Sequence, residues 1–278
     1  MTLRDLVRWI PKEPLIRLPG ARRLWRRFPV GSVHVRTRFD IWERPAYAYG
    51  VHSAAKLAKE LGIPRIAVIE FGVARGTGLV ALEHVCAQVE AALGIAIAVY
   101  GFDSGRGNPK PVDYRDLPYI WDEGSYAMDE PALRARLKGA KLILGAVADT
   151  VDEFIRDVPD PVGFISFDLD YYSSTMDAFH IFEGPPSTRL PRVFCYFDDI
   201  LWPERAYYND FTGEYLAIRE FNEHHSHQKI AKIPHLHRMR RYPEAWNEQI
   251  YVFHDFEHPA YCTNVRRNGS LAENEMPL

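Results

Sequence analysis

From residue 66 onward, short apolar runs alternate with stretches that repeat their apolar residues at helical spacing. The runs are rich in β-branched and aromatic residues, and they cover 66–70, 96–102, 141–144, 162–168, 192–197, 229–234 and 249–256. The helical stretches cover 44–62, 78–92, 130–137, 150–155, 175–182 and 213–224. This alternation is typical of an α/β fold, with a parallel sheet between two layers of helices. The last two runs are joined by 236–248, which is rich in Arg and Pro and predicts a loop, so we expect the final pair to be antiparallel.

The bulk composition limits the class of protein. With 278 residues, the chain is long enough for one large hydrophobic core. A formal net charge of -3 gives no general attraction to nucleic acid, and no apolar stretch approaches the ~20 residues of a membrane-spanning helix. We therefore expect neither a nucleic-acid partner nor a transmembrane segment. Cys86, Cys195 and Cys262 lie far apart without metal-type spacing, which favours free thiols and a cytoplasmic location.

The N-terminal segment is basic and irregular. Residues 1–30 contain eight Arg and Lys residues, and prolines and charges interrupt any apolar run of the kind that a signal peptide has. We expect a lid or an oligomer contact, with an anionic membrane or glycan surface as the alternative. The predicted organisation is a basic extension over 1–50, a single α/β domain over 51–265 and a tail over 266–278. A homodimer or a higher homo-oligomer is left open.

A second irregular segment lies inside the predicted domain. Residues 105–129 contain several Pro and Gly residues and are too long for a plain connection between two elements. Long loops without regular structure in compact domains are usually lids or binding loops. We therefore expect 105–129 to act as a lid.

A glycine-rich turn follows the first strand candidate. Glu70 stands at the tip of that strand, and Gly72, Gly76 and Gly78 lead into a helical stretch. Glycines allow a sharp turn and a ligand close to the main chain, while the helix N-terminus offers unpaired N–H groups to an anion. The pattern G-x-G-x-x-A over 76–81 also fits a dinucleotide site. A negative Glu70, however, would repel a pyrophosphate and attract an α-ammonium group, which favours a cofactor with an amino group. A turn without any ligand is a third interpretation.

The second strand candidate ends in an acidic residue. It reads Gly-Phe-Asp-Ser over 101–104, with Asp103 at the tip and Ser104 after it. An acidic residue in this position can accept hydrogen bonds from both ribose hydroxyls of an adenosine. Asp103 suits either type of cofactor, and a capping role at the strand end is the alternative.

Carboxylates also end two later strand candidates. Asp168 ends the fourth run and Asp170 follows it, and Asp198 and Asp199 follow the fifth. Adjacent parallel strands place their C-terminal tips side by side, where open α/β sheets bind ligands. Four carboxylates gathered there repel each other unless a cation or protons intervene, and their oxygens suit Mg²⁺ or Mn²⁺ better than Zn²⁺. The sequence therefore predicts a divalent-metal site, with helix capping or turn formation as the alternative. Asp168 and Asp170 also match the D-x-D of metal-dependent glycosyltransferases, which hold a nucleotide-sugar diphosphate through a cation.

Together these motifs resemble those of the macrocin O-methyltransferase family, the metal-dependent sugar O-methyltransferases of macrolide and aminocoumarin antibiotic pathways. The pattern E-x-G-x-x-x-G-x-G over 70–78 is similar to motif I of class I methyltransferases, and 101–104 and 145–150 match as well. The most specific part is DLDYYSSTMD over 168–177, similar to D-x-D-L-Y-x-S-T-x-D, together with the pair at 198–199. The resemblance covers about residues 66–200. Two positions depart from the family pattern, since Arg106 replaces a frequent acidic residue and Tyr171 replaces a leucine.

The resemblance implies a Rossmann-like class I methyltransferase fold, with a seven-stranded, mostly parallel sheet whose last strand is antiparallel. It implies that Asp168, Asp198 and Asp199 bind Mg²⁺ or Mn²⁺, and that Asp170 is the general base. The residues expected to bind S-adenosylmethionine lie at three strand ends and are Glu70, Gly72, Gly76, Gly78, Asp103, Ser104, Ala146 and Val147.

The predicted activity is methyl transfer from S-adenosylmethionine to a hydroxyl of a sugar or glycoside, either a small molecule or an oligosaccharide. Such an in-line displacement requires alignment of the acceptor oxygen, the methyl carbon and the sulfur. A metal on the acceptor oxygen would lower the pKa of the hydroxyl, and a nearby carboxylate would take its proton. A histidine of the groups at 224–227 or 235–237 is the alternative base, although a solvated helix end explains the first group better. The alternatives for the whole protein are a metal-dependent glycosyltransferase, an NAD(P)-linked oxidoreductase and a binding module without catalysis.

Overall fold

The computed structural model describes residues 20–158 and 160–265, and within these residues the chain forms one seven-stranded sheet. The strand order is β3-β2-β1-β4-β5-β7-β6. All neighbours pair in parallel except β7, which is antiparallel to both β5 and β6. The strands are β1 (Arg65–Phe71), β2 (Ala96–Asp103), β3 (Lys141–Leu144), β4 (Val162–Phe167), β5 (Arg189–Phe197), β6 (Gln228–Lys232) and β7 (Ile250–Asp255). The expected mostly parallel sheet with an antiparallel last strand is confirmed.

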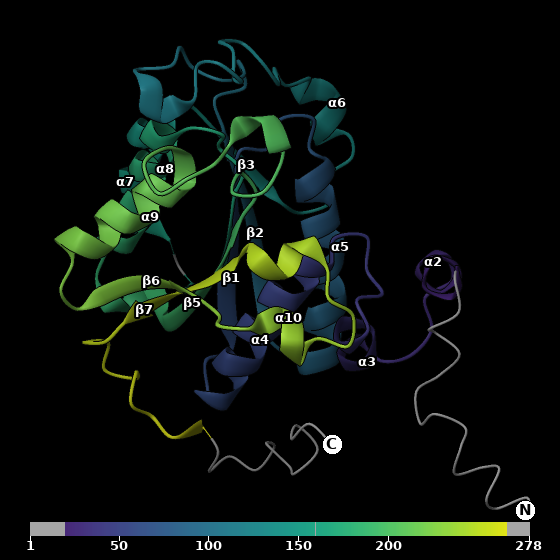
Figure 1. Cartoon of the computed structure of the whole chain (residues 1–278). Coiled ribbons are helices and arrows are strands. Elements are labelled where there is room, and N and C mark those ends of the chain that lie inside the picture. Colours follow the sequence, from purple (N-terminus) through teal and green to yellow (C-terminus); the bar gives the residue numbers. More distant parts are fainter. Residues whose placement is uncertain (1–19, 159, 266–278) are drawn as a thin grey trace, which may run out of the picture.

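Helices cover both faces of the sheet (Figure 1). One face carries α4 and α5, and the opposite face carries α7, α8 and α9. These helices are α4 (Pro45–Glu60), α5 (Thr77–Leu93), α7 (Val147–Asp157), α8 (Tyr172–Phe179) and α9 (Gly213–His224). Shorter helical segments are α2 (Ala21–Arg27), α3 (Val33–Arg38), α6 (Glu130–Arg134), α10 (Leu236–Met239), η2 (Tyr114–Asp116), η3 (His180–Phe182), η4 (Pro186–Thr188), η5 (Glu204–Ala206) and η6 (Ala245–Glu248).

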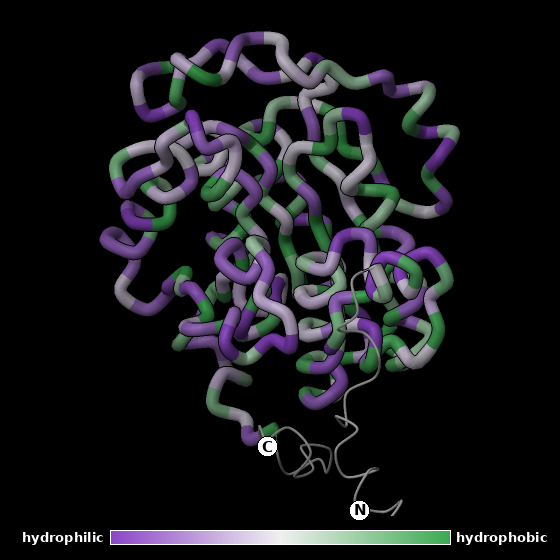
Figure 2. The backbone as a smooth tube through the Cα atoms, turned by 45° about the vertical axis from the view of Figure 1, so that its right-hand side comes forward, coloured by the Kyte–Doolittle hydropathy of each residue, from purple (hydrophilic) through white to green (hydrophobic). Residues whose placement is uncertain are grey.

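The hydrophobic core forms one layer on each face of the sheet. All six residues of β4 are buried, as expected for a parallel strand that is covered on both faces. In one layer the ring of Phe164 meets Tyr47 of α4 edge to face, with centroids 5.9 Å apart. In the other layer Phe167 stacks on Phe197 of β5 at 4.7 Å. Figure 2 shows the same distribution, since hydrophobic residues are concentrated in the central strands and many hydrophilic residues lie in the outer loops.

Several elements differ in extent from the sequence-based expectation. Helix α8 begins at Tyr172 instead of residue 175, because the strand ends one residue earlier, at Phe167, and the turn after it is short. Strand β5 begins at Arg189 instead of residue 192, and the Arg189 guanidinium forms a buried ion pair with Asp255 at the end of β7. The expected loop 236–248 contains the short α10 and η6, neither of which forms a crossover.

The N-terminal part contributes to the core before residue 50. Helix α4 packs on β4 and β5, and Ile41, Trp42 and Tyr47 are buried. The predicted boundary at residue 50 and the role of the extension stay predictions. Residues 1–19 and the tail 266–278 lie outside the described residues. None of the helices in the described part is long and apolar enough to cross a lipid bilayer.

Candidate functional site

A cavity of about 920 Å³ opens at the carboxyl ends of β1, β2, β4 and β5. The strand order reverses between β1 and β4, and open α/β sheets bind ligands in the crevice at such a switch point. Its volume lies within the range of small-molecule sites. Its walls come from the strand ends, the start of α7 and the loop 105–129, which lies above the sheet in Figure 1.

The glycine turn after β1 is shaped by close approaches. Gly72 has a φ of 81°, and a Cβ there would lie 1.7 Å from the carbonyl oxygen of Asp168. Only glycine therefore fits between the ends of β1 and β4. Gly76 also has a positive φ, but a Cβ there would meet the Leu133 side chain of α6 at 2.0 Å. Gly72 lines the cavity, whereas Gly76 faces α6.

Glu70 lies beneath the turn and not in the cavity wall. Its Oε1 accepts a hydrogen bond of 2.5 Å from the Tyr47 hydroxyl, and a Cβ at Gly78 would lie 2.0 Å from the same oxygen. Its Oε2 has no hydrogen-bond partner among the described residues. Burial raises the pKa of Glu70 to about 7, although the Tyr47 hydrogen bond and the Arg44 charge act in the other direction. Glu70 and Gly78 thus fix how α5 meets β1.

Asp103 holds the turn from the neighbouring strand. Its Oδ2 accepts hydrogen bonds from the backbone N–H groups of Val73 and Ala74, each at 2.8 Å, and its Oδ1 accepts one from Gly105 at 2.6 Å. The Ser104 hydroxyl donates to the carbonyl of Gly107 at 3.0 Å. Asp103 and Ser104 nevertheless line the cavity.

The end of β3 completes this side of the cavity. Ala146 and Val147 line it, and they form the N-cap and the first residue of α7. The backbone there is the start of a helix, whose unpaired N–H groups attract acceptor atoms of a ligand. Five of the eight predicted cofactor residues therefore line the cavity, namely Gly72, Asp103, Ser104, Ala146 and Val147.

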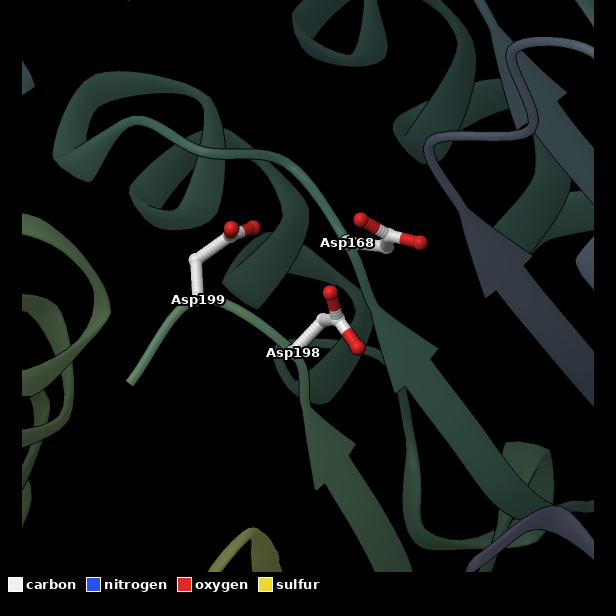
Figure 3. A group of neighbouring side chains, drawn as sticks. All are labelled: Asp168, Asp198 and Asp199. Atoms are coloured by element: carbon white, nitrogen blue, oxygen red, sulfur yellow. The ribbon is translucent and has the colours of Figure 1, made fainter. Parts of the chain in front are cut away.

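The predicted metal ligands meet at the tips of β4 and β5. One carboxylate oxygen from each of Asp168, Asp198 and Asp199 lies within 4.8 Å of the others (Figure 3). Burial and the Asp198 charge raise the pKa of Asp168 well above its usual range. Burial and the Asp170 charge do the same to the pKa of Asp199. Oxygen-only ligands that share like charge are the donor set of a hard divalent cation, so these residues fit Mg²⁺ or Mn²⁺.

Asp170 lies beside this triad without belonging to it. Its backbone N–H donates to Asp199 Oδ2 at 2.8 Å, and its Oδ2 accepts a 2.8 Å hydrogen bond from the side-chain amide of Asn108. Its φ of 59° is left-handed, an unusual conformation for a non-glycine residue. The carboxylate lines the cavity next to the triad.

The structure adds residues that the sequence analysis missed. Glu214 at the start of α9 is fully buried, and its Oε2 accepts a 3.0 Å hydrogen bond from the backbone N–H of Asp199. Tyr196 donates its hydroxyl to Asp198 Oδ1 at 2.5 Å. Burial and the Asp198 charge raise the pKa of Glu214 well above its usual range. An acid in the first turn of a helix is common, so its position alone gave no signal.

The loop 105–129 covers the cavity and is held at two further points. Asp116, which is buried, accepts hydrogen bonds from the backbone N–H and the hydroxyl of Ser173 at 2.8 and 3.0 Å. The Tyr119 hydroxyl donates to the carbonyl of Ala206. The loop therefore forms part of the cavity wall, and its movement as a lid stays a prediction.

The histidine groups lie elsewhere. Within the described residues, no histidine lines the cavity. Nδ1 of His224 lies 2.7 Å from the Glu220 carbonyl, and the His225 ring stacks on Phe221 at 4.0 Å. These contacts are those of a helix end, and they leave Asp170 as the candidate base.

Comparison with known proteins yields similar structures only. No protein-family model and no curated protein matches the chain. Among solved structures it is similar to CalS11, a calicheamicin methyltransferase, at 17% identity and a TM-score of 0.48, over 84% of this chain and 89% of that one. It is similar to an O-methyltransferase from Bacillus cereus in complex with SAH, at 11% identity and 0.39, over 73% and 78% of the two chains. It is also similar to MycE from the mycinamycin pathway, in complex with Mg and SAH, at 14% identity and 0.35, over 73% and 48%.

The fold class is that of the class I methyltransferases. It rests on the strand order of the sheet and its antiparallel seventh strand.

Proposed function

We propose that this protein is an S-adenosylmethionine-dependent O-methyltransferase that acts on a hydroxyl of a sugar or glycoside with the help of Mg²⁺ or Mn²⁺. One observation carries the proposal: a glycine turn braced by Asp103 and a triad of carboxylates open into the same cavity. The first feature suits a nucleoside cofactor, and the second suits a cation and an oxygen nucleophile. The presence of both features favours methyl transfer, because neither glycosyl transfer nor hydride transfer needs both of them.

The cofactor half of the site has two kinds of residue. Gly72, Asp103, Ser104, Ala146 and Val147 line the cavity and would contact S-adenosylmethionine. Asp103 would accept a hydrogen bond from a ribose hydroxyl at the acceptor site on Oδ1 that its three backbone hydrogen bonds leave free. The buried residues of this half would shape the turn from below, and they are Glu70, Gly76 and Gly78.

In the acceptor half, Asp168, Asp198 and Asp199 would hold the cation. A bound divalent cation would lower the pKa of an acceptor hydroxyl and fix its direction. Asp170 faces the same space and would take the proton of that hydroxyl. The acceptor oxygen then forms its bond to the methyl carbon as the carbon–sulfur bond breaks. The products are a methyl ether, S-adenosylhomocysteine and a proton held by Asp170.

Two other enzyme classes remain to be separated by experiment. A glycosyltransferase would use Asp168 and Asp170 for a nucleotide-sugar diphosphate, but it has no need of the turn at 70–78. An NAD(P)-linked oxidoreductase would use that turn, but it has no need of the triad. A cytoplasmic location also belongs to the proposal, and it is supported by the buried free thiols of Cys86 and Cys195.

The test is a binding and transfer experiment on the purified protein. Calorimetry is expected to show binding of S-adenosylmethionine or S-adenosylhomocysteine and none of UDP-glucose or NADPH. With Mg²⁺ and methyl-labelled S-adenosylmethionine, label is expected in a glycoside of a mixed panel. Binding of NADPH or UDP-glucose without S-adenosylmethionine binding would contradict the proposal, and cofactor binding without transfer would favour a non-catalytic module.

A further inference from the structure

Exposed aromatic rings are frequent on two chain segments that each contribute residues to the cavity wall. Half or more of each side chain is open to solvent, although large hydrophobic residues are usually buried. One segment is 114–126 and the other is 202–211. We call this set the aromatic rim, and it consists of Tyr114, Tyr119, Tyr126, Trp202, Tyr207 and Phe211.

The rim is continuous with the cavity. Tyr126 and Trp202 both line it, with 50% and 62% of their surface exposed. The hydrogen bond from Tyr119 to the Ala206 carbonyl ties the two segments together. The Tyr208 hydroxyl donates to the Trp202 carbonyl at 3.2 Å and holds the second segment in place. Tyr126 and Trp202 therefore belong to the same cavity as the acid triad, and hydrogen bonds hold the two segments that carry them.

An unpaired donor points to a ligand in the same place. The indole Nε1 of Trp121 is buried and has no hydrogen-bond partner among the described residues, and Trp121 lines the cavity beside Tyr126. Leaving a buried donor unpaired is unfavourable, and a hydroxyl of a bound ligand would satisfy it. The site thus offers flat apolar rings and a hydrogen-bond donor together.

This combination fits a saccharide. A sugar ring has an apolar face of C–H groups, which packs on aromatic rings, and an edge of hydroxyls, which needs donors and acceptors. The charges on the two segments are mixed and mostly acidic, with Arg115 and Arg205 as the cations and Asp116, Asp122, Glu123, Glu204 and Asp210 as the anions. A surface of this kind has no bias toward an anionic membrane, which would require a cluster of basic residues.

We propose that the aromatic rim binds sugar units outside the one that is methylated, so that the acceptor is a saccharide or glycoside of two or more units. This inference rests on the proposed function, because the reacting hydroxyl is taken to lie at the acid triad. Trp202 and Tyr126 hold the unit next to the reacting one, and Tyr207 holds a unit further out.

The experiment compares acceptor lengths. Free saccharides of one to four units of glucose, mannose, galactose and rhamnose are tested for methyl transfer with saturating S-adenosylmethionine and Mg²⁺. At least one series is expected to show kcat/KM rising about tenfold, or about 1.4 kcal/mol, from one unit to three or four. Trp202→Ala and Tyr207→Ala are expected to remove most of this gain through KM. Phe256→Ala, which truncates an exposed ring beyond the end of β7, is the matched control and is expected to retain the gain.

The outcomes separate this inference from the proposed function. Transfer to single sugars with no gain in longer ones, or a gain that survives both rim substitutions, overturns the rim assignment and leaves the methyltransferase intact. If no acceptor is methylated, the proposed function fails, and tryptophan fluorescence titration with the tetrasaccharides decides the rim separately. Saturable binding that Trp202→Ala weakens would support the rim, and absence of binding would overturn it. Sedimentation with phosphatidylglycerol vesicles that Trp202→Ala abolishes would assign the rim to a membrane instead.

Discussion

The two halves of the cavity treat their carboxylates in opposite ways. In the cofactor half, Asp103 accepts three backbone hydrogen bonds, and Glu70 accepts one from a buried tyrosine. In the acceptor half, Asp168, Asp198 and Asp199 face one another within 4.8 Å. Glu214 brings a further buried carboxylate against the backbone of Asp199.

This difference shows in which half the protein itself balances the carboxylate charges and in which half a ligand or protons must do so. The three backbone hydrogen bonds stabilise the charge of Asp103 and fix its position, so the glycine turn of the cofactor half is preorganised. Like charges that share a site oppose one another, so the acceptor half is stable only when protons or a cation balance it. We therefore expect cofactor binding to be independent of metal, and metal binding to stabilise the fold.

The largest effect on activity is expected from a substitution that disrupts the acceptor half alone. Asp198→Asn removes one charge from the triad, and turnover is expected to fall by roughly 10³-fold, which corresponds to about 4 kcal/mol of transition-state stabilisation. Treatment with EDTA is expected to do the same, and Mg²⁺ is expected to restore only the wild type. The measurement is the initial rate of methyl transfer at saturating S-adenosylmethionine.

A thermal readout checks this assignment without activity. Mg²⁺ is expected to raise the Tm of the wild type, since binding to the native state stabilises it, and this rise is expected to vanish in Asp198→Asn. Asp177→Asn, on α8 at the edge of the same cavity, is the control and is expected to keep the rise. Full activity in EDTA, or an unchanged Mg²⁺ response in Asp198→Asn, would show that the acid cluster is structural.

The complementary experiment disrupts the cofactor half by a substitution of Asp103. Asp103→Asn removes acceptor capacity from the turn and is expected to weaken S-adenosylmethionine binding by about tenfold, the cost of one charged hydrogen bond. Its Mg²⁺-dependent rise in Tm is expected to persist. Calorimetry with S-adenosylhomocysteine gives the affinity, and a variant that loses both responses would mean that the halves are not independent.

Asp170 separates the chemical step from metal binding, because it lies beside the triad and is not one of the three predicted metal ligands. Asp170→Asn is expected to slow the chemical step by about 10²-fold, the lower range for a general base. Metal binding, measured by the rise in Tm, is expected to survive. Asn108→Ala, which removes the amide that donates to Asp170, is expected to have a smaller effect on the same step. A loss of less than about threefold in Asp170→Asn would exclude Asp170 as the base.

Glu70 allows a test of stability against pH. Its folded pKa of about 7 lies above the ordinary value of 4.5, so the folded protein holds this proton more tightly than the unfolded chain does. The stabilisation is complete below pH 4.5 and is lost as the pH rises through about 7, a change on the order of 3 kcal/mol. Glu70→Gln cannot ionise, and its free energy of unfolding is expected to depend less on pH in this window than that of the wild type. Parallel curves for the two proteins, from urea unfolding between pH 4.5 and 8, would refute the assignment.

Much of this arrangement could be predicted because parallel strands end at one edge of a sheet. That rule alone brought Asp168, which follows β4, together with Asp198, which follows β5, and placed Asp103 beside the glycine turn. It could not show that Glu70 is buried, because Tyr47, the residue that covers it, lies 23 positions earlier on α4, and the packing of α4 beside α5 is not given by the strand rule. Nor could it reveal Glu214, whose burial depends on where α9 crosses the end of β5.

The loop 105–129 gives the smallest effect, and it links the two halves. It begins at the Asp103 side of the cavity, reaches Asp170 through Asn108, and is pinned to α8 through Asp116. A ligand that fills the cavity would add contacts along this loop and reduce its local opening. We expect limited proteolysis within 105–129 to slow about threefold with S-adenosylhomocysteine, on the scale of 0.6 kcal/mol, and further when Mg²⁺ and an acceptor are added. Asp116→Asn is expected to speed cleavage of the free protein by weakening the bonds to Ser173, while leaving the protection by ligand in place. Mass spectrometry of the first cleavage products locates the cut, and equal rates with and without ligands would mean that the loop is a fixed wall and not a lid.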